Sequence, residues 1–86
     1  MPFTVYILLC SDGSFYTGYT KDLDARTKLH QNGYGAKYTK THKPEKLAYS
    51  EQFDSRSTAM KREREIKKLS HQQKLALVNS QTRKQP

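Results

Sequence analysis

The sequence predicts a small α+β domain that opens with a β-hairpin. Two runs of β-branched, aromatic and aliphatic residues, 3–10 and 15–20, flank a polar turn that contains Gly13. A third run of this kind covers 47–53, and stretches with apolar residues at helical spacing follow it. Strand signals and helix signals in one short chain give the α+β class.

A first helix is expected between the hairpin and the third strand. Asp22 is a suitable N-cap residue, because its side chain can accept a hydrogen bond from an unpaired backbone N–H of the first turn. The helix would run to about Asn32, and Gly33 would end it. Residues 32–44, which follow, are basic and contain tyrosines.

Two more helices are expected after the third strand. The first of them would end near Leu69. Ser70, with Gln73 three residues later, resembles a capping box for a last helix that runs through Val78. Three residues can cap the helix that ends near Leu69: Asp54, Ser55 and Ser57.

Length and charge limit what the protein can be. Its 86 residues, 34% of them hydrophobic, can bury one modest core, which is expected in a single domain over 1–79 with a disordered polar tail at 80–86. The 16 Lys and Arg against 8 Asp and Glu give a formal charge of +8, which favours a polyanionic partner and nucleic acid first. An acidic membrane surface or an acidic protein fits the charge equally well.

The cysteine content and the N-terminus indicate a cytoplasmic protein. Cys10 is the only cysteine and has no partner for an intrachain disulfide, which favours a reducing compartment. No signal peptide is evident, and no segment approaches the roughly 20 apolar residues that span a bilayer. The expected localisation is therefore the cytoplasm, without a membrane partner.

One acidic residue breaks the pattern of the helix that follows the third strand. The apolar residues Ala59, Met60, Ile66 and Leu69 form one stripe, and Glu63 lies on that stripe. A carboxylate drawn toward a core costs several kcal/mol unless a cation meets it. Glu63 is therefore either half of a structural ion pair with Arg or Lys, or a metal ligand.

Two further patterns also have both a structural and a functional explanation. Arg26 and His30 are four residues apart and share a helix face, which is either a solvated surface or a pair directed at a phosphate. Tyr6 and Tyr16 lie in the two hairpin strands, where aromatic packing across the strands is the ordinary explanation.

The order and spacing of these residues resemble the GIY-YIG nuclease family. That family is named after two tripeptides on a β-hairpin, which are Val5-Tyr6-Ile7 and Tyr16-Thr17-Gly18 here. Val5 replaces the first glycine and Thr17 replaces the isoleucine of the pattern. The resemblance covers roughly residues 3–79 and is nearest to small, stand-alone bacterial members. It continues through Asp22, Leu23, Arg26 and His30, the run 35–39, the strand 47–51, and the pair Arg62 and Glu63.

The resemblance implies a three-stranded antiparallel sheet flanked by helices, with a catalytic site on the hairpin. Tyr6 and Tyr16 would line this site, and one of them would position or deprotonate the attacking water. Arg26 would contact the scissile phosphate. His30 would be a further polar or general-base residue.

The resemblance also implies a metal site. Glu63 would be the sole protein ligand of one Mg²⁺ or Mn²⁺ ion, which leaves the other coordination positions to water and substrate. A tyrosine with a pKa near 10 is a poor base at neutral pH, so Arg26, Lys21 or the metal would have to lower that pKa. Asn79 matches a late asparagine of some family members.

Three functions fit these observations. The first is a metal-dependent endonuclease that hydrolyses phosphodiester bonds in DNA, with branched or damaged DNA and a role in DNA repair as candidates. The second is a nucleic-acid-binding module with little or no intrinsic cleavage, and the third is an adaptor for an acidic protein. The side chains expected to contact nucleic acid, by charge or by stacking on unpaired bases, are Lys21, Tyr34, Lys37, Tyr38 and Lys40.

Overall fold

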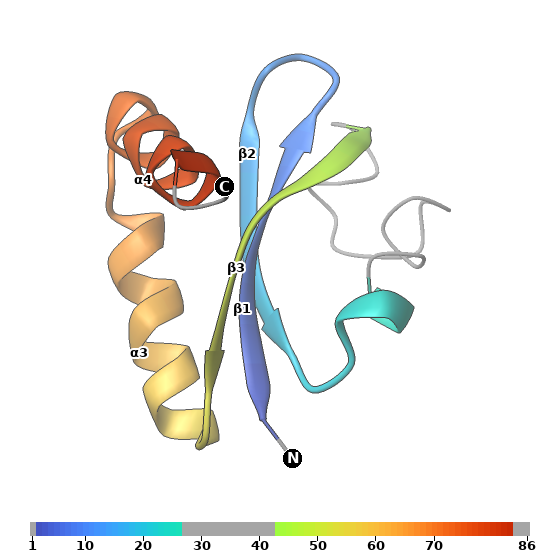
Figure 1. The fold of residues 1–86 in the computed structure, drawn as a ribbon, viewed down its shortest axis with the longest axis vertical. Helices are drawn as coiled ribbons and strands as arrows, with labels where there is room; N and C mark the ends of the chain where they lie inside the picture. The colour runs from blue at the N-terminus through green and yellow to red at the C-terminus, as the bar shows by residue number, and fades with distance from the viewer. Residues whose placement is uncertain (1, 27–42, 84–86) are drawn as a thin grey trace.

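A computed structural model of the protein describes residues 2–26 and 43–83. A three-stranded antiparallel sheet of β1 (Phe3–Cys10), β2 (Phe15–Thr20) and β3 (Pro44–Phe53) precedes the helices α3 (Arg56–Lys67) and α4 (His71–Arg83). Figure 1 shows α3 and α4 on one side of the sheet and the short helical turn at 23–26 on the other. The predicted α+β class, N-terminal hairpin and three-stranded sheet are confirmed.

The sheet has the strand order β2-β1-β3, so the most apolar strand is central. Tyr6 lies opposite Gly18 on β2 and opposite Ser50 on β3. The pairing of β1 with β3 shifts register between Ile7 and Leu8, and again between Leu9 and Cys10. Such bulges bend and twist the strand that carries them.

The core lies between the sheet and the two long helices. Val5 and Ile7 of β1 form a buried cluster with Tyr49, Ala59 and Ile66. The alternate residues of β1 are buried as well, since Tyr6, Leu8 and Cys10 are each 1% exposed. Both faces of β1 are therefore covered, which explains its nearly continuous apolar sequence.

The caps of the two long helices agree with the sequence. Ser55 is the N-cap of α3 and its hydroxyl accepts a hydrogen bond from the Thr58 N–H. Ser70 and Gln73 form the predicted capping box, with the Ser70 N–H donating to Gln73 Oε1 at 2.9 Å and the Gln73 N–H donating to Ser70 Oγ at 3.2 Å. Among the residues that the structure describes, neither helix has the length and apolar character that would let it cross a membrane.

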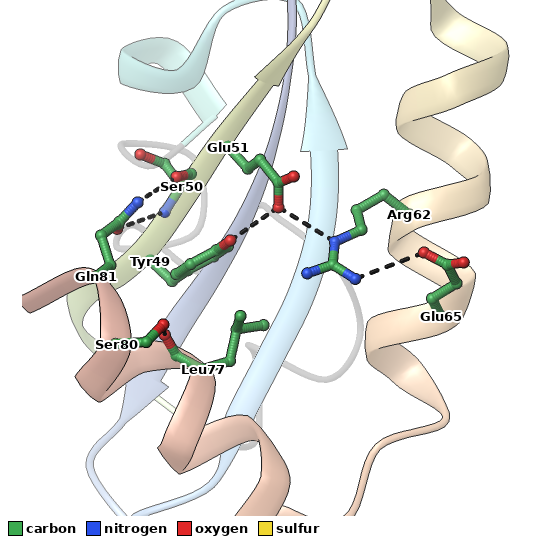
Figure 2. A network of polar contacts seen from close by, with 8 residues as sticks. All are labelled: Tyr49, Ser50, Glu51, Arg62, Glu65, Leu77, Ser80 and Gln81. Atoms are coloured by element: carbon green, nitrogen blue, oxygen red, sulfur yellow. Dashed lines mark hydrogen bonds and ion pairs between the residues drawn. The ribbon is translucent and has the colours of Figure 1, made fainter. Parts of the chain in front are cut away.

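Two element boundaries differ from the sequence prediction. β3 begins at Pro44 rather than Leu47, which is possible because β3 is an edge strand and its first residue needs no N–H donor. α4 continues to Arg83, so the prediction that this helix ends at Val78 is wrong. The Gln81 side chain pairs with the Ser50 backbone through both its oxygen and its nitrogen (Figure 2).

Candidate active site

The hairpin brings the phenol of Tyr6 over a glycine on the neighbouring strand. Tyr6 and Gly18 are cross-strand partners. A Cβ atom placed on Gly18 would lie 2.6 Å from Tyr6 Oη and 2.8 Å from Tyr6 Cζ. No real side chain tolerates contacts this short, so the Tyr6 ring occupies the space that any side chain at position 18 would need. The glycine thus lets the phenol reach across β2 toward the edge of the sheet.

Tyr16 completes the aromatic part of this site. Its ring centroid is 6.3 Å from that of Tyr6, with the planes tilted by 42°, which is within the range of ordinary aromatic pairs. Tyr16 Cε2 would be 3.3 Å from the same hypothetical Cβ on Gly18. Tyr6 is buried whereas Tyr16 is half-buried, so Tyr16 is the phenol nearer to solvent.

Three neighbours act on the Tyr6 phenol in addition to its burial. Burial raises the pKa of Tyr6 well above its usual value, and the charges of Tyr16 and Glu63 raise this pKa further. The Arg26 guanidinium lowers the pKa of Tyr6, but it does not outweigh burial. The electrostatic coupling indicates that Tyr16, Arg26 and Glu63 all lie near this hydroxyl.

Arg26 is carried by the helical turn that follows β2. The Ala25 N–H donates to Asp22 Oδ1 at 3.1 Å, so Asp22 caps this turn as predicted. The Thr20 hydroxyl accepts a hydrogen bond from the Asp22 N–H at 3.2 Å, which fixes the start of the turn to the end of the strand. Arg26 itself is exposed. The strand end therefore positions Arg26 beside the hairpin and leaves its guanidinium accessible to an anion.

Glu63 is held on the sheet side of α3. The flanking residues Ala59 and Ile66 are each 0% exposed and pack into the core, and the Glu63 side chain is only 16% exposed. Glu63 Oε1 forms an ion pair with Lys67 Nζ, one helical turn later, at 3.2 Å. Because the Lys67 side chain is 53% exposed, this ion pair contributes little stability.

The elements that carry Arg26 and Glu63 lie on opposite sides of the sheet. α3 packs on the Val5 and Ile7 face, whereas the helical turn that bears Arg26 lies on the opposite side (Figure 1). Both residues act on the Tyr6 phenol, which extends over Gly18 toward β2, the edge strand of the sheet. The candidate site is therefore located around the edge of the sheet.

A half-buried polar network next to Glu63 was not predicted. The Tyr49 hydroxyl donates to Glu51 Oε2 at 2.8 Å, and Arg62 Nε donates to the same oxygen at 3.1 Å (Figure 2). Burial works against the charge of Arg62, yet its hydrogen bonds to Glu51 and Tyr49 leave the Arg62 pKa raised. This network ties α3 to β3 at the residue that precedes Glu63. Glu51 and Arg62 are 11 residues apart in the sequence, so no local sequence pattern predicts that they pair.

The donor chemistry around Glu63 fits a hard divalent cation such as Mg²⁺ or Mn²⁺. A carboxylate of low exposure is a ligand that such ions prefer. Within 2–26 and 43–83, no three His, Cys, Asp or Glu side chains gather into a metal-binding group. Glu63 is thus the residue that could hold the ion, with water and substrate as further ligands.

The remaining predicted site residues are distributed as follows. Lys21 lies next to this cluster, in a pocket that Arg26 also lines. Asn79 lies on α4, in a groove that Leu47 and Leu75 also line. Tyr6, Tyr16, Arg26 and Glu63 do not line this groove, so the role of Asn79 stays a prediction. Five predicted residues fall outside the described part of the chain: His30, Tyr34, Lys37, Tyr38 and Lys40.

Comparison with known proteins agrees with this geometry. The family model described as the GIY-YIG catalytic domain matches residues 2–76. A UPF0213 protein of Staphylococcus saprophyticus is 55% identical over 75 residues, which are 87% of this chain and 92% of that protein. A UPF0213 protein of Staphylococcus aureus is 54% identical over 74 residues, 86% of this chain and 90% of that protein.

Two solution structures are similar as well. The UPF0213 protein of Bacillus halodurans is 49% identical, with a TM-score of 0.59 over 92% of this chain and 84% of that one. A protein from E. faecalis is 36% identical, with a TM-score of 0.66 over 100% of this chain and 92% of that one. The family pattern and the phenols, guanidinium and carboxylate around β2 therefore agree, and the chain belongs to the GIY-YIG nuclease family.

Proposed function

We propose that this protein is a metal-dependent endonuclease that hydrolyses phosphodiester bonds in DNA. The observation that carries the proposal is the coupling of Tyr16, Arg26 and Glu63 to the Tyr6 phenol at the edge of the sheet. Hydrolysis of a phosphodiester needs a positioned water and a cationic group that offsets charge developing on the phosphate oxygens. Both requirements match the residue types that meet here.

Each side chain has a role that follows from its surroundings. The exposed Arg26 would bind the scissile phosphate through its planar set of N–H donors. Tyr6 stays protonated because burial raises its pKa, so it would donate a hydrogen bond to the water or the phosphate. Tyr16, the phenol nearer to solvent, would then position the water for attack on the phosphate. A Mg²⁺ or Mn²⁺ ion on Glu63 would supply Lewis-acid stabilisation of the phosphate charge.

The substrate would be selected by shape more than by base sequence. Arg26 would contact a phosphate, and phosphate contacts carry no base sequence information directly. Branched and damaged DNA are the candidate substrates, because their distorted backbones would expose phosphates to these side chains.

A DNA cleavage assay tests the enzyme directly. The protein is incubated with duplex, single-stranded and branched DNA in the presence of Mg²⁺ or Mn²⁺, beside Glu63→Gln. We expect the parent to cut at least one substrate, EDTA to stop the cutting, and Glu63→Gln to lose roughly 100-fold or more in rate.

Glu65→Gln is the matched control for this assay. Glu65 lies on the same helix, is 55% exposed and makes only a long 3.5 Å ion pair with Arg62. This variant should cut like the parent. Equal rates for Glu63→Gln and Glu65→Gln would refute the assignment of Glu63.

One observation favours the second candidate, a binding module without cleavage. The Glu63 carboxylate is already paired with Lys67 at 3.2 Å, so its charge does not require a metal ion. The formal charge of +8 is sufficient for binding a polyanion. Binding that weakens steeply with salt, without cutting by the parent or by either variant, would favour this module over the enzyme.

A further inference from the structure

The pocket that Lys21 and Arg26 line adjoins the candidate active site. It lies at the end of the sheet where β1 begins, β2 ends and α3 begins, and has a volume of about 530 Å³. This is within the range of about 300–1,000 Å³ that small-molecule sites occupy. Six of the residues that line it matter for its chemistry: Phe3, Tyr19, Lys21, Asp22, Arg26 and Arg56.

The charges of this pocket are not balanced from within it. Lys21, Arg26 and Arg56 supply three cations, and no ion pair of any of them with a carboxylate occurs within the described residues. Among the lining residues that the structure describes, Asp22 is the only carboxylate, and its Oδ1 atom already accepts the Ala25 N–H. Three cations around one space repel one another unless an anion enters.

Two of the cations are held in place by aromatic side chains. The Lys21 ammonium lies 5.5 Å from the centre of the Phe3 ring, which is cation–π distance. Arg56 Nε donates to the Tyr19 hydroxyl oxygen at 3.2 Å. The pocket is therefore partly preorganised, which lowers the entropy cost of binding a ligand there.

The contact between Arg56 and Tyr19 leaves donors for a ligand. Because the Tyr19 oxygen accepts from Arg56 Nε, its own O–H is a donor, and it has no acceptor among the residues described. The terminal nitrogens of Arg56 likewise have no partner in this part of the protein. A phosphate group matches these donors. The Arg56 guanidinium can bind two phosphate oxygens in parallel, and the Tyr19 hydroxyl can donate a hydrogen bond beside it.

From this arrangement we infer a subsite for a non-scissile phosphate of the substrate strand, formed by Arg56, Tyr19 and Lys21. This inference rests on the proposed action on nucleic acid. Arg26 lines the pocket and also acts on Tyr6, so it connects the subsite to the candidate active site.

The spacing suits a neighbouring phosphate of the same strand. Tyr19, Thr20 and Lys21 follow Gly18 by one to three residues, which corresponds to about 3–10 Å of extended chain. Phosphates on one strand of a duplex advance by about 3.4 Å along the axis per nucleotide. The subsite would hold a phosphate within about three nucleotides of the one that is cut, and would fix the direction in which the strand crosses the site.

Binding measurements without divalent metal test this subsite apart from catalysis. The dissociation constant of a fluorescent DNA duplex is measured over a series of KCl concentrations for the parent, Arg56→Gln and Tyr19→Phe. We expect Arg56→Gln to weaken binding roughly tenfold and to lower the slope of log K against log salt by about one, as loss of one phosphate contact predicts. Tyr19→Phe should weaken binding less and leave this slope unchanged, because it removes a neutral donor.

Arg64→Gln is the control, because Arg64 is an exposed cation of the same helix that does not line the pocket. Its affinity and salt slope should stay close to those of the parent. Equal effects of Arg56→Gln and Arg64→Gln, with binding and cutting by the parent intact, would overturn the subsite and leave the proposed function standing.

The remaining outcomes are also decisive. If the parent bound no nucleic acid, both proposals would fail together. Circular dichroism checks that the variants are folded. Should Arg56→Gln unfold, Arg56→Lys takes its place, with the salt slope expected to persist and the affinity to fall because the guanidinium is lost.

Discussion

At the scale of single residues, one buried hydroxyl has no hydrogen-bond partner among the residues that the structure describes. Thr17 is 3% exposed, and its Oγ1 atom has no partner within the described chain. A buried hydroxyl without a partner costs about 1–3 kcal/mol relative to its hydrated state. Thr17 occupies the middle of the second tripeptide, where the family pattern has an apolar residue.

Replacing this hydroxyl by a methyl group should therefore stabilise the protein. We expect Thr17→Val to raise the free energy of unfolding by about 1 kcal/mol, measured by urea denaturation. The control is Thr20→Val, because the Thr20 hydroxyl bonds the Asp22 N–H and carbonyl. That variant should lose stability. A less stable Thr17→Val would mean that its hydroxyl is hydrated or paired.

Tyr6 should make stability depend on pH in the alkaline range. Burial, then Tyr16, raises the pKa of Tyr6 above 10, the value that an unfolded chain would have. Below pH 10 the phenol is neutral in both states and the stability is fully present. As the pH rises above 10, the unfolded state loses this proton first, so the free energy of unfolding falls by up to about 1.4 kcal/mol per pH unit.

The measurement is the urea midpoint between pH 8 and 11. Tyr6→Phe should flatten the alkaline decline relative to the parent. Some decline should remain, because burial and the hydrogen bond to Glu51 also raise the pKa of Tyr49. Parallel curves for the parent and Tyr6→Phe would show that Tyr6 ionises normally in the folded protein.

At the scale of elements, α4 connects two distant parts of the sheet. At its start, His71 Nε2 donates to the Gly13 carbonyl at 3.1 Å, and the His71 ring lies 4.8 Å from that of Phe15. Near its end, Gln81 Nε2 donates to the Ser50 carbonyl at 2.7 Å and Gln81 Oε1 accepts the Ser50 N–H at 3.2 Å. The amide thus pairs with the outer edge of β3 as another strand would.

Removing this amide should weaken the fold and expose a strand edge. We expect Gln81→Ala to lower the free energy of unfolding by about 1–2 kcal/mol, because two half-buried backbone groups lose their partners. It should also promote association that increases with concentration. Urea denaturation and sedimentation measure the two effects. Gln72→Ala, which changes an exposed glutamine of the same helix, should show neither effect.

Elements fixed by local signals could be predicted, and those fixed by distant contacts could not. The hairpin and the capping box of α4 match the sequence prediction because each depends on residues close in the chain. The end of α4 was placed too early, because its apolar pattern stops at Val78 whereas Gln81 is held by Ser50. A side chain that pairs with a strand edge leaves no periodic signal.

At the scale of the whole molecule, the candidate site depends on how the chain folds around β2. The family resemblance predicted Tyr6, Tyr16, Arg26 and Glu63 as site residues. From the residues alone, Glu63 was notable only for its place on an apolar stripe. Their grouping around the Tyr6 phenol depends on the strand order and on Gly18, neither of which a spacing rule supplies.

One feature of the sequence could have indicated the cationic pocket beside the candidate site. Arg56 is the first residue of α3, whose first turn contains no acidic residue. A cation there opposes the helix dipole, which favours negative charge at an N-terminus. An unfavourable charge of this kind indicates a role outside helix stability.

The close approach of Tyr6 to Gly18 makes the site sensitive to a single methyl group. The methyl group of an alanine at position 18 would push the Tyr6 phenol out of its present position. All the predicted catalytic side chains would still be present. Such a protein would separate the contribution of alignment from that of reactivity, a distinction that deleting a phenol or a carboxylate cannot make.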